Sequence, residues 1–177
     1  MRWSQLLTLF ALTSLPFATG CEKATDSNAT AAHATAVNID GSKFLLSEEP
    51  DGAIGVIAAR ESAEDGKPLV MVGRIGGAAN PWIEGRAAFT LLDASMTVVT
   101  EGEEAEGAIC TGDCCANERL TCTAMVKVVD AEGQLIAVDS RQLLGVKEAD
   151  MVVVEGKAQK DKTGNFVMLA NRVYIRR

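Results

Sequence analysis

Apolar and polar residues alternate along much of the chain after Pro68, and this period of two restricts the fold more than any other feature. The clearest case is the segment 121–130, in which Ala124, Val126 and Val128 fall on one face. Side chains that alternate in this way lie on opposite faces of a β-strand. By this pattern, or by their content of β-branched residues, six segments are predicted to be strands: 69–75, 86–95, 121–130, 130–138, 151–161 and 165–177.

A short helical turn is predicted to interrupt these strands at 140–150, where Ser140 is suited to be the N-cap. If the segments 121–130 and 130–138 form one hairpin-like third strand, the order is three strands, a short helix and two strands. This is the order of an OB fold, a small five-stranded Greek-key barrel. The alternative is an immunoglobulin-like sandwich, which has about seven strands and no helix.

Two glycines and the last two strands carry a resemblance to OB domains. Gly73 in the first strand and Gly156 in the fourth lie where OB barrels bend sharply and a side chain would clash. The last two strands read VVVEGKAQKDKTGNFVMLANRVYI, which is similar to the closing hairpin of many OB domains. The resemblance covers residues 68–177 and implies a mainly β, OB-like Greek-key barrel with one short helix.

Gly73, Phe89 and Asp93 also match a pattern of the periplasmic cytochrome c maturation chaperones. Those membrane-tethered OB proteins have a glycine in the first strand and F-x-x-x-D in the second. They attach haem through a histidine after the last strand, and this sequence has no histidine there. The resemblance therefore implies the fold and not haem carriage.

Residues 1–20 have the pattern of a bacterial lipoprotein signal peptide. Arg2 is the only charged residue before Cys21, and an apolar run is followed by small residues. The run is shorter than the ~20 residues that a membrane-spanning helix needs. The stretch Ala-Thr-Gly-Cys resembles a lipobox, in which signal peptidase cuts before a lipid-bearing cysteine, although Ala18 replaces the usual leucine. We therefore expect Cys21 to be lipidated and to anchor the chain in a membrane.

The residue after Cys21 is Glu22, not the aspartate that often retains such lipoproteins in the inner membrane. By that resemblance, the expected location is the bacterial cell envelope, at the outer membrane facing the periplasm. Residues 21–40 are rich in Ala, Thr, Ser and Asn and are predicted to be a flexible tether.

Residues 41–67 are predicted to form a helical lead-in to the barrel. Ser47 or Glu48 can cap a short helix, and Pro50 suits its first turn. The apolar face of this helix is expected to consist of residues at spacing i, i+3 and i+4, namely Ile54, Ile57 and Ala58.

Charge and histidine content narrow the possible functions. The chain has a net charge of −7, which opposes binding to a polyphosphate backbone, so nucleic acid is not expected as a partner. The only histidine, His33, lies in the predicted tether. Ser-His-Asp and Cys-His catalytic groups need a histidine held in the fold, so we expect a binding module and not an enzyme.

Four of the five cysteines lie close together with the spacing C-x3-C-C-x6-C: Cys110, Cys114, Cys115 and Cys122. The C-x2-C spacing of zinc ribbons and of thioredoxin-like sites is absent. Export places these cysteines in an oxidising compartment, where an even set normally pairs. Two disulfides are therefore expected to pin the long loop 96–122 to the barrel. The alternatives are a thiolate site for copper(I), zinc or an iron–sulfur cluster, and thiol redox chemistry.

The connection between the first two strands carries the candidate ligand site. In OB folds, the face of strands two and three and the neighbouring loops bind ligands. Trp82, with Arg74 and Arg86 nearby in sequence, can form a basic-aromatic spot for a small ligand or an envelope protein. The alternative is that Trp82 fills one end of the barrel.

The whole chain, with the stretches VGRIGG and NPWIEGRAAFTLLD and its adjacent cysteine pair, resembles uncharacterised lipoproteins of planctomycete-type bacteria. That resemblance implies a fold and an envelope location. The expected function is a membrane-anchored periplasmic binding or envelope-interaction module with no resident cofactor. The alternative is a lipoprotein whose cysteine loop binds a metal or carries out thiol redox chemistry.

Overall fold

The computed structural model describes residues 39–99, 108–110 and 116–177. The chain divides into two units, Met1–Ala34 and Thr35–Arg177, and the described residues all belong to the second. The predicted signal peptide, the lipidation site Cys21 and the tether up to residue 38 lie outside the described residues. Within the described ranges, no helix is long and apolar enough to cross a membrane.

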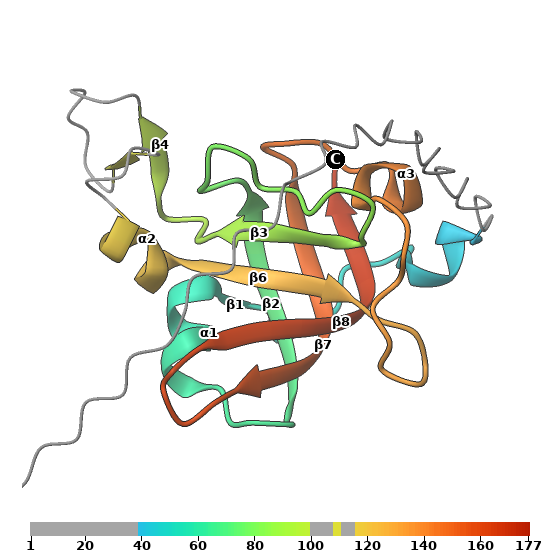
Figure 1. Ribbon diagram of the computed structural model, residues 1–177, viewed down its shortest axis with the longest axis horizontal. Helices are drawn as coiled ribbons and strands as arrows, with labels where there is room; N and C mark the ends of the chain where they lie inside the picture. The colour runs from blue at the N-terminus through green and yellow to red at the C-terminus, as the bar shows by residue number, and fades with distance from the viewer. Residues whose placement is uncertain (1–38, 100–107, 111–115) are drawn as a thin grey trace, which may run out of the picture. The chain divides into compact units, whose positions relative to one another are not determined.

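The described part of the chain is mainly β, with a closed barrel of five strands (Figure 1). The barrel strands are β2 (Pro68–Ile75), β3 (Ala88–Leu92), β6 (Thr123–Val128), β7 (Met151–Lys160) and β8 (Phe166–Arg176). Their hydrogen-bonded order is β2-β3-β6-β8-β7, and β7 pairs back with β2. Only the β6–β8 pair among them is parallel. This is the OB order, so the prediction of a small OB-like barrel is confirmed.

Alternate side chains of the barrel strands fill its interior. Phe89 and Leu91 on β3 and Val126 and Val128 on β6 are fully buried in one apolar cluster. Buried apolar surface of this kind is the main favourable contribution to folding, at roughly 25 cal/mol per Å². The alternation seen in the sequence is thus the alternation between the core and the outer face.

Gly73 and Gly156 allow neighbouring strands to approach closely. A Cβ atom on Gly73 would lie 2.7 Å from the carbonyl oxygen of Leu92, and one on Gly156 would lie 2.0 Å from that of Leu169. The β7–β8 pairing also shifts register at Gly156, where a bulge bends the strand. The prediction that a side chain would clash at both positions is confirmed.

Helices α1 (Val56–Ser62) and α3 (Ser140–Leu144) lie at opposite ends of the barrel (Figure 1). Both insert apolar side chains into the core: Val56, Ala59, Leu143 and Leu144. Before α1, the 3-10 helix η1 (Gly41–Phe44) adds Phe44 to the core. The short strand β1 (Ile54–Gly55) pairs in parallel with β2.

The predicted lead-in helix begins later than expected. Its N-cap is Gly55, so Ser47, Glu48 and Pro50 all precede it. Its buried residues are Val56 and Ala59, and not the predicted stripe of Ile54, Ile57 and Ala58. A carboxylate 36 positions further along the chain satisfies the first turn of α1, and local sequence cannot reveal such a cap.

Two further elements differ from prediction near α3. The expected strand at 130–138 is a turn with one isolated bridge, because the Asp130 carboxylate accepts backbone N–H groups across it. The N-cap of α3 is Asp139 and not Ser140. The Asp139 carboxylate accepts the Arg141 N–H at 2.9 Å, whereas the buried Ser140 hydroxyl donates to the Arg86 carbonyl at 3.4 Å.

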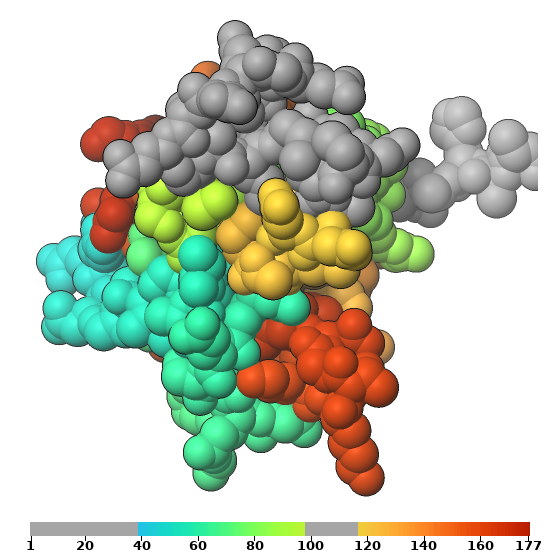
Figure 2. Space-filling model, turned by 90° about the vertical axis from the view of Figure 1, so that its left-hand side faces the viewer, coloured from blue at the N-terminus to red at the C-terminus, as the bar shows by residue number. Residues whose placement is uncertain are grey.

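The predicted loop 96–122 contains secondary structure. Strands β4 (Thr97–Val99) and β5 (Ala108–Cys110) form a separate parallel pair, and α2 (Ala116–Cys122) follows. Figure 2 shows α2, in yellow, beside α1, in blue-green. Cys122 is therefore the last residue of a helix and does not open a strand.

Candidate functional site

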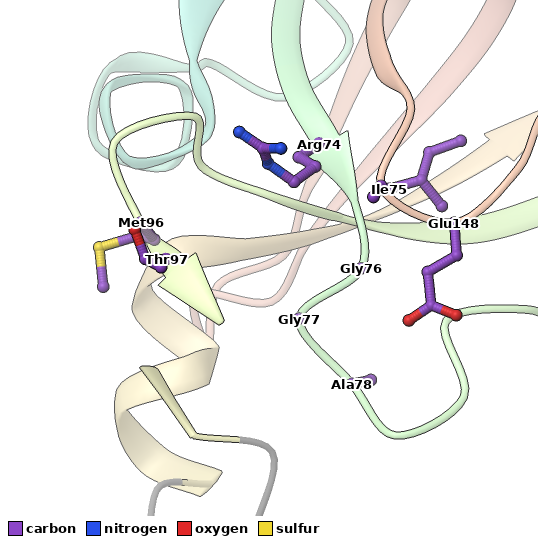
Figure 3. A pocket seen from close by; sticks show the side chains of 9 residues that line it. Arg74, Ile75, Gly76, Gly77, Ala78, Met96, Thr97 and Glu148 are labelled. Atoms are coloured by element: carbon purple, nitrogen blue, oxygen red, sulfur yellow. The ribbon is translucent and has the colours of Figure 1, made fainter. Parts of the chain in front are cut away.

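A hollow of about 340 Å³ lies at the rim of the barrel, where three connections meet (Figure 3). They are the connection after β2, the one between β3 and β4, and the one before β7. The lining residues are Arg74, Ile75, Gly76, Gly77, Ala78, Met96, Thr97, Glu148 and Ala149. Small-molecule sites usually measure ~300–1,000 Å³, so this hollow can take a small ligand.

Arg74 is the positively charged group of the hollow. It lies near the end of β2, opposite Leu92 on β3 and Met151 on β7. Its side chain is partly buried and forms no hydrogen bond or ion pair with any residue that the structure describes. Figure 3 places its guanidinium on one side of the Gly76–Gly77 backbone and the carboxylate of Glu148 on the other.

The backbone around the hollow is unusual. Gly76 and Gly77 have φ angles of 150° and 82°, and Ala149 has a φ of 69°. Ala149 is the only residue other than glycine with a positive φ among those described. A left-handed conformation costs an alanine ~1–2 kcal/mol, and such strain is often found at functional sites.

Two backbone hydrogen bonds, one from Ala149 and one to the next residue, hold this segment in place. Its N–H donates to the Ile75 carbonyl at 2.9 Å, and the Ile75 N–H donates to the Asp150 carbonyl at 2.9 Å. These bonds attach the segment before β7 to the end of β2. The position of Glu148 is therefore fixed relative to Arg74 through the barrel backbone.

A small apolar cluster outside the barrel adjoins the hollow. Leu92 and Cys122 are buried in it, and Ile57 and Met96 pack against them. Met96 also lines the hollow, so one wall of the hollow is continuous with this cluster. The strand partners of Arg74, Leu92 and Met151, are apolar as well, and apolar surroundings lower the local dielectric constant and strengthen the attraction between a guanidinium and an anion.

Cys122 is a free, buried thiol in the structure. The prediction that all four clustered cysteines pair in two disulfides is therefore wrong for Cys122. Its Sγ donates to the Glu118 carbonyl at 3.5 Å within α2. Burial raises the pKa of the Cys122 thiol, so it is protonated at neutral pH and a poor metal ligand.

The other clustered cysteines cannot be compared with the prediction in the same way. Cys114 and Cys115 lie outside the described residues, as does the side chain of Cys110 at the end of β5. Because Cys122 is free, at most one disulfide can form among the other three cysteines, and that disulfide and the alternative metal site stay predictions. Elsewhere in the described ranges, no group of three or more His, Cys, Asp or Glu side chains gathers to hold a metal ion.

The three predicted ligand residues do not come together. Trp82 is only 9% exposed and packs in the barrel core, with its ring centroid 6.2 Å from that of Phe89. This was the alternative interpretation of Trp82. Arg86 is exposed on the same connection, and Arg74 lines the rim hollow, to which Trp82 does not contribute.

The cation beside Trp82 is Arg141, which the sequence analysis missed. Its guanidinium carbon lies 5.3 Å from the Trp82 ring centroid, and it forms ion pairs with Asp139 at 2.7 Å and Glu84 at 3.1 Å. The hydrogen bond from Arg141 lowers the pKa of Asp139. These contacts of Arg141 attach the β2–β3 connection to α3, so the role of Arg141 is structural. The Asp-x-Arg spacing at a helix start was the signal that could have revealed it.

Known proteins give no further guide to the site. No protein-family profile matches the chain, and no curated protein matches it. The resemblance to planctomycete-type lipoproteins therefore stays a prediction. The function has to be argued from the geometry of the rim hollow and from the sequence pattern at the N-terminus.

Proposed function

We propose that this protein is a lipid-anchored binding module of a bacterial cell envelope, and that the rim hollow is its ligand site. The observation that carries the proposal is the Arg74 guanidinium, partly buried in a hollow of small-molecule size without a partner among the described residues. A partly buried guanidinium loses part of its hydration, and no described residue compensates for this loss with a hydrogen bond. A carboxylate or phosphate ligand can supply such bonds in a bidentate arrangement of two parallel N–H···O hydrogen bonds.

The rigidity of the site supports a binding role. Arg74 is on a barrel strand paired on both sides, and Glu148 and Ala149 are attached to the same strand end by hydrogen bonds. Sites held by strands are positioned more accurately than sites on free loops. A preformed hollow binds a ligand without an ordering cost.

The anchoring half of the proposal rests on the signal peptide pattern and the lipobox-like stretch before Cys21. Lipidation at this cysteine and the tether after it would hold the barrel near the outer membrane on the periplasmic side. The test is expression of the whole chain in a bacterium, followed by fractionation and intact-mass measurement. The wild type and a Ser27→Ala control should be membrane-bound and lipidated. A Cys21→Ser chain that is still processed and membrane-bound would disprove the anchor.

The binding half is tested with two matched arginine variants. Wild-type, Arg74→Gln and Arg86→Gln chains are incubated with envelope extract, and the retained compounds and proteins are identified by mass spectrometry. A component retained by the wild type and by Arg86→Gln, but lost from Arg74→Gln, is the expected result. Equal retention by all three chains, or equal loss from both variants, would contradict a site at Arg74.

A second candidate function is a metal or thiol redox site in the cysteine segment 110–122. The observation in its favour is that Cys122 is a free thiol in place of a disulfide. Its raised pKa weighs against it, because metals and oxidants react with the thiolate. Elemental analysis and non-reducing intact mass of the native protein distinguish the two: stoichiometric metal supports this candidate, and its absence with a full thiol count removes the metal version.

A further inference from the structure

We propose that Asp51 and Gly52 form a site of spontaneous covalent modification, at which the chain rearranges to isoaspartate through a cyclic succinimide. The inference goes beyond the proposed function and depends neither on the rim hollow nor on the anchor. The chain contains three Asp-Gly pairs, at 40–41, 51–52 and 65–66, and no Asn-Gly pair. Asp-Gly pairs are prone to this reaction because glycine has no Cβ to shield its backbone nitrogen. Their contacts in the structure distinguish the three pairs.

The reaction needs only the groups of the pair and water. The backbone nitrogen of Gly52 attacks the side-chain carboxyl carbon of Asp51, and a water molecule leaves as the five-membered ring closes. Water then opens the ring at one of its two carbonyl carbons. Cleavage of the bond from nitrogen to the side-chain carbon restores aspartate, whereas cleavage of the bond from nitrogen to the main-chain carbon gives isoaspartate. The mass is unchanged, and the main chain is one carbon atom longer.

The turn that contains Asp51 and Gly52 is free to undergo ring closure. Both residues are exposed, and Gly52 has a φ of 78° and open space around its Cα. Neither the Asp51 carboxylate nor the Gly52 N–H forms a hydrogen bond with any residue that the structure describes. The neighbouring attachments are the ion pair of Glu49 before the turn and strand β1 after it. The attacking nitrogen and the carboxyl carbon can therefore approach each other without breaking either attachment.

The pair at 65–66 is the matched comparison, because it is also an exposed turn and Gly66 has a φ of 73°. Here both reacting groups are bound to β7. The Asp65 carboxylate accepts the Lys160 N–H at 2.9 Å, and the Gly66 N–H donates to the Ala158 carbonyl at 2.8 Å. Ring closure at this pair requires both hydrogen bonds to break first.

The pair at 40–41 is held by a cap and by close packing. The Asp40 carboxylate accepts the Ser42 N–H at 3.0 Å at the start of η1. Gly41 lies so close to Leu143 that a Cβ atom on it would be 1.7 Å from the Leu143 carbonyl oxygen. The backbone of this pair has little room to rotate toward the ring geometry. Of the three pairs, only the one at 51–52 thus has the reactive sequence without restraining contacts among the described residues.

The test is peptide mapping of the full-length protein after several weeks in buffer at neutral pH. Trypsin places the three pairs in separate peptides, 24–43, 44–60 and 61–74. An isoaspartyl peptide has an unchanged mass and a shifted retention time, and electron-based fragmentation locates the altered residue. Isoaspartate should be at least about tenfold more abundant at position 51 than at 40 or 65, since the other two pairs must first lose hydrogen bonds or packing contacts.

Two controls separate the effect of the fold from that of the local sequence. The same chain unfolded in guanidinium chloride should form isoaspartate at all three pairs at comparable rates. Asp51→Glu should abolish the shifted form of peptide 44–60, because glutamate needs a larger ring that closes far more slowly. This exposed substitution should leave the melting temperature unchanged.

Equal amounts of isoaspartate at the three pairs of the folded protein would overturn the inference, because contacts would then not control the reaction. Absence of isoaspartate at position 51 of the folded protein would overturn it as well. A shifted peptide 44–60 that persists in Asp51→Glu would show that the altered residue is not Asp51.

Discussion

Asp93 caps a helix that lies far from it in sequence, and this contact allows a sharp test of the fold. Asp93 is 6% exposed, and its carboxylate accepts the N–H of Ile57 at 2.9 Å, with a further bond from Val56. The other carboxylate oxygen accepts the N–H and hydroxyl of Ser95 at 2.9 and 2.6 Å. Gly55, the N-cap of α1, makes no side-chain bond, so Asp93 takes over the role of the cap.

The structure sets the size of the effect for Asp93→Ala. Loss of a helix N-cap costs about 1 kcal/mol, and loss of a hydrogen bond to a charged group costs about 1.5–3 kcal/mol. We therefore expect Asp93→Ala to lower the free energy of unfolding by about 3 kcal/mol. Asp93→Asn keeps one acceptor oxygen and should cost less.

Gly55→Ala is the second arm of the test. A Cβ atom at this position would lie 2.7 Å from Oδ2 of Asp93. The backbone of Gly55, with φ −64° and ψ 164°, is ordinary for alanine, so the clash is the main cost. Overpacking of this kind costs about 1–3 kcal/mol. Once Asp93 is alanine the clash partner is absent, and Gly55→Ala should cost almost nothing.

A double-mutant cycle measures the coupling by urea denaturation of the Cys21→Ser chain. The double variant should be about 2 kcal/mol more stable than the sum of the single changes predicts, because only wild-type Asp93 clashes with Ala at 55. Gly133→Ala has open space around its Cβ and serves as the control, since it should combine additively with Asp93→Ala. Additive behaviour of the Gly55–Asp93 pair would refute the reasoning.

The stabilisation that the Asp93 carboxylate provides should depend on pH. Burial alone raises the pKa of Asp93, but the hydrogen bonds from Ser95 and from Ile57 and Val56 outweigh burial and lower the pKa. A carboxyl group with a lowered folded-state pKa stabilises the fold above its unfolded pKa, and this stabilisation is lost as the pH falls through the folded value. The stability difference between wild type and Asp93→Asn should thus shrink below about pH 4. A difference that is constant from pH 7 to pH 3 would contradict the assignment.

Three further predictions concern the core. Trp82→Ala should lower the free energy of unfolding by about 3–5 kcal/mol, and an unchanged melting temperature would show that the ring is not part of the core. Gly156→Ala should destabilise the fold more than Gly133→Ala, because a Cβ atom at position 156 would lie 2.0 Å from the backbone of Leu169. Gly133→Ala is expected to cost about 1 kcal/mol. Cys122 should resist iodoacetamide in the native protein and react after unfolding without reductant. Reaction in the native state, or none after unfolding, would be the contrary result.

The barrel could be predicted from the sequence because its signals are local. Each strand carries its own alternation or its own run of apolar residues, and Gly73 and Gly156 are the residue type that a close strand approach requires. The structure also explains the two residues of the F-x-x-x-D match. Phe89 packs in the core, and Asp93, which follows the end of β3, caps α1. Residue type and spacing identified the core role of Phe89, but they did not reveal that Asp93 caps a helix 36 positions away.

The errors came from contacts between distant segments. The start of α1 depends on Asp93, and the environment of Trp82 depends on Arg141 rather than on Arg86. The sequence places Arg86 near Trp82, but the chain turns between them and exposes Arg86 to solvent. Closeness in sequence therefore did not predict side-chain contacts at places where distant segments of the chain pack together.

The rim hollow shows why the ligand class is harder to predict than the fold. Arg74 and Glu148 are far apart in sequence, and they line one hollow because β2 pairs with β7 and the Ile75 backbone bonds to Ala149 and Asp150. Those bonds use backbone atoms, so they form whatever side chains occupy positions 74 and 148. Substitutions at such outward positions usually change stability by less than about 0.5 kcal/mol. The same barrel can therefore hold other side chains at this rim, so the identity of residues 74 and 148 does not follow from the fold.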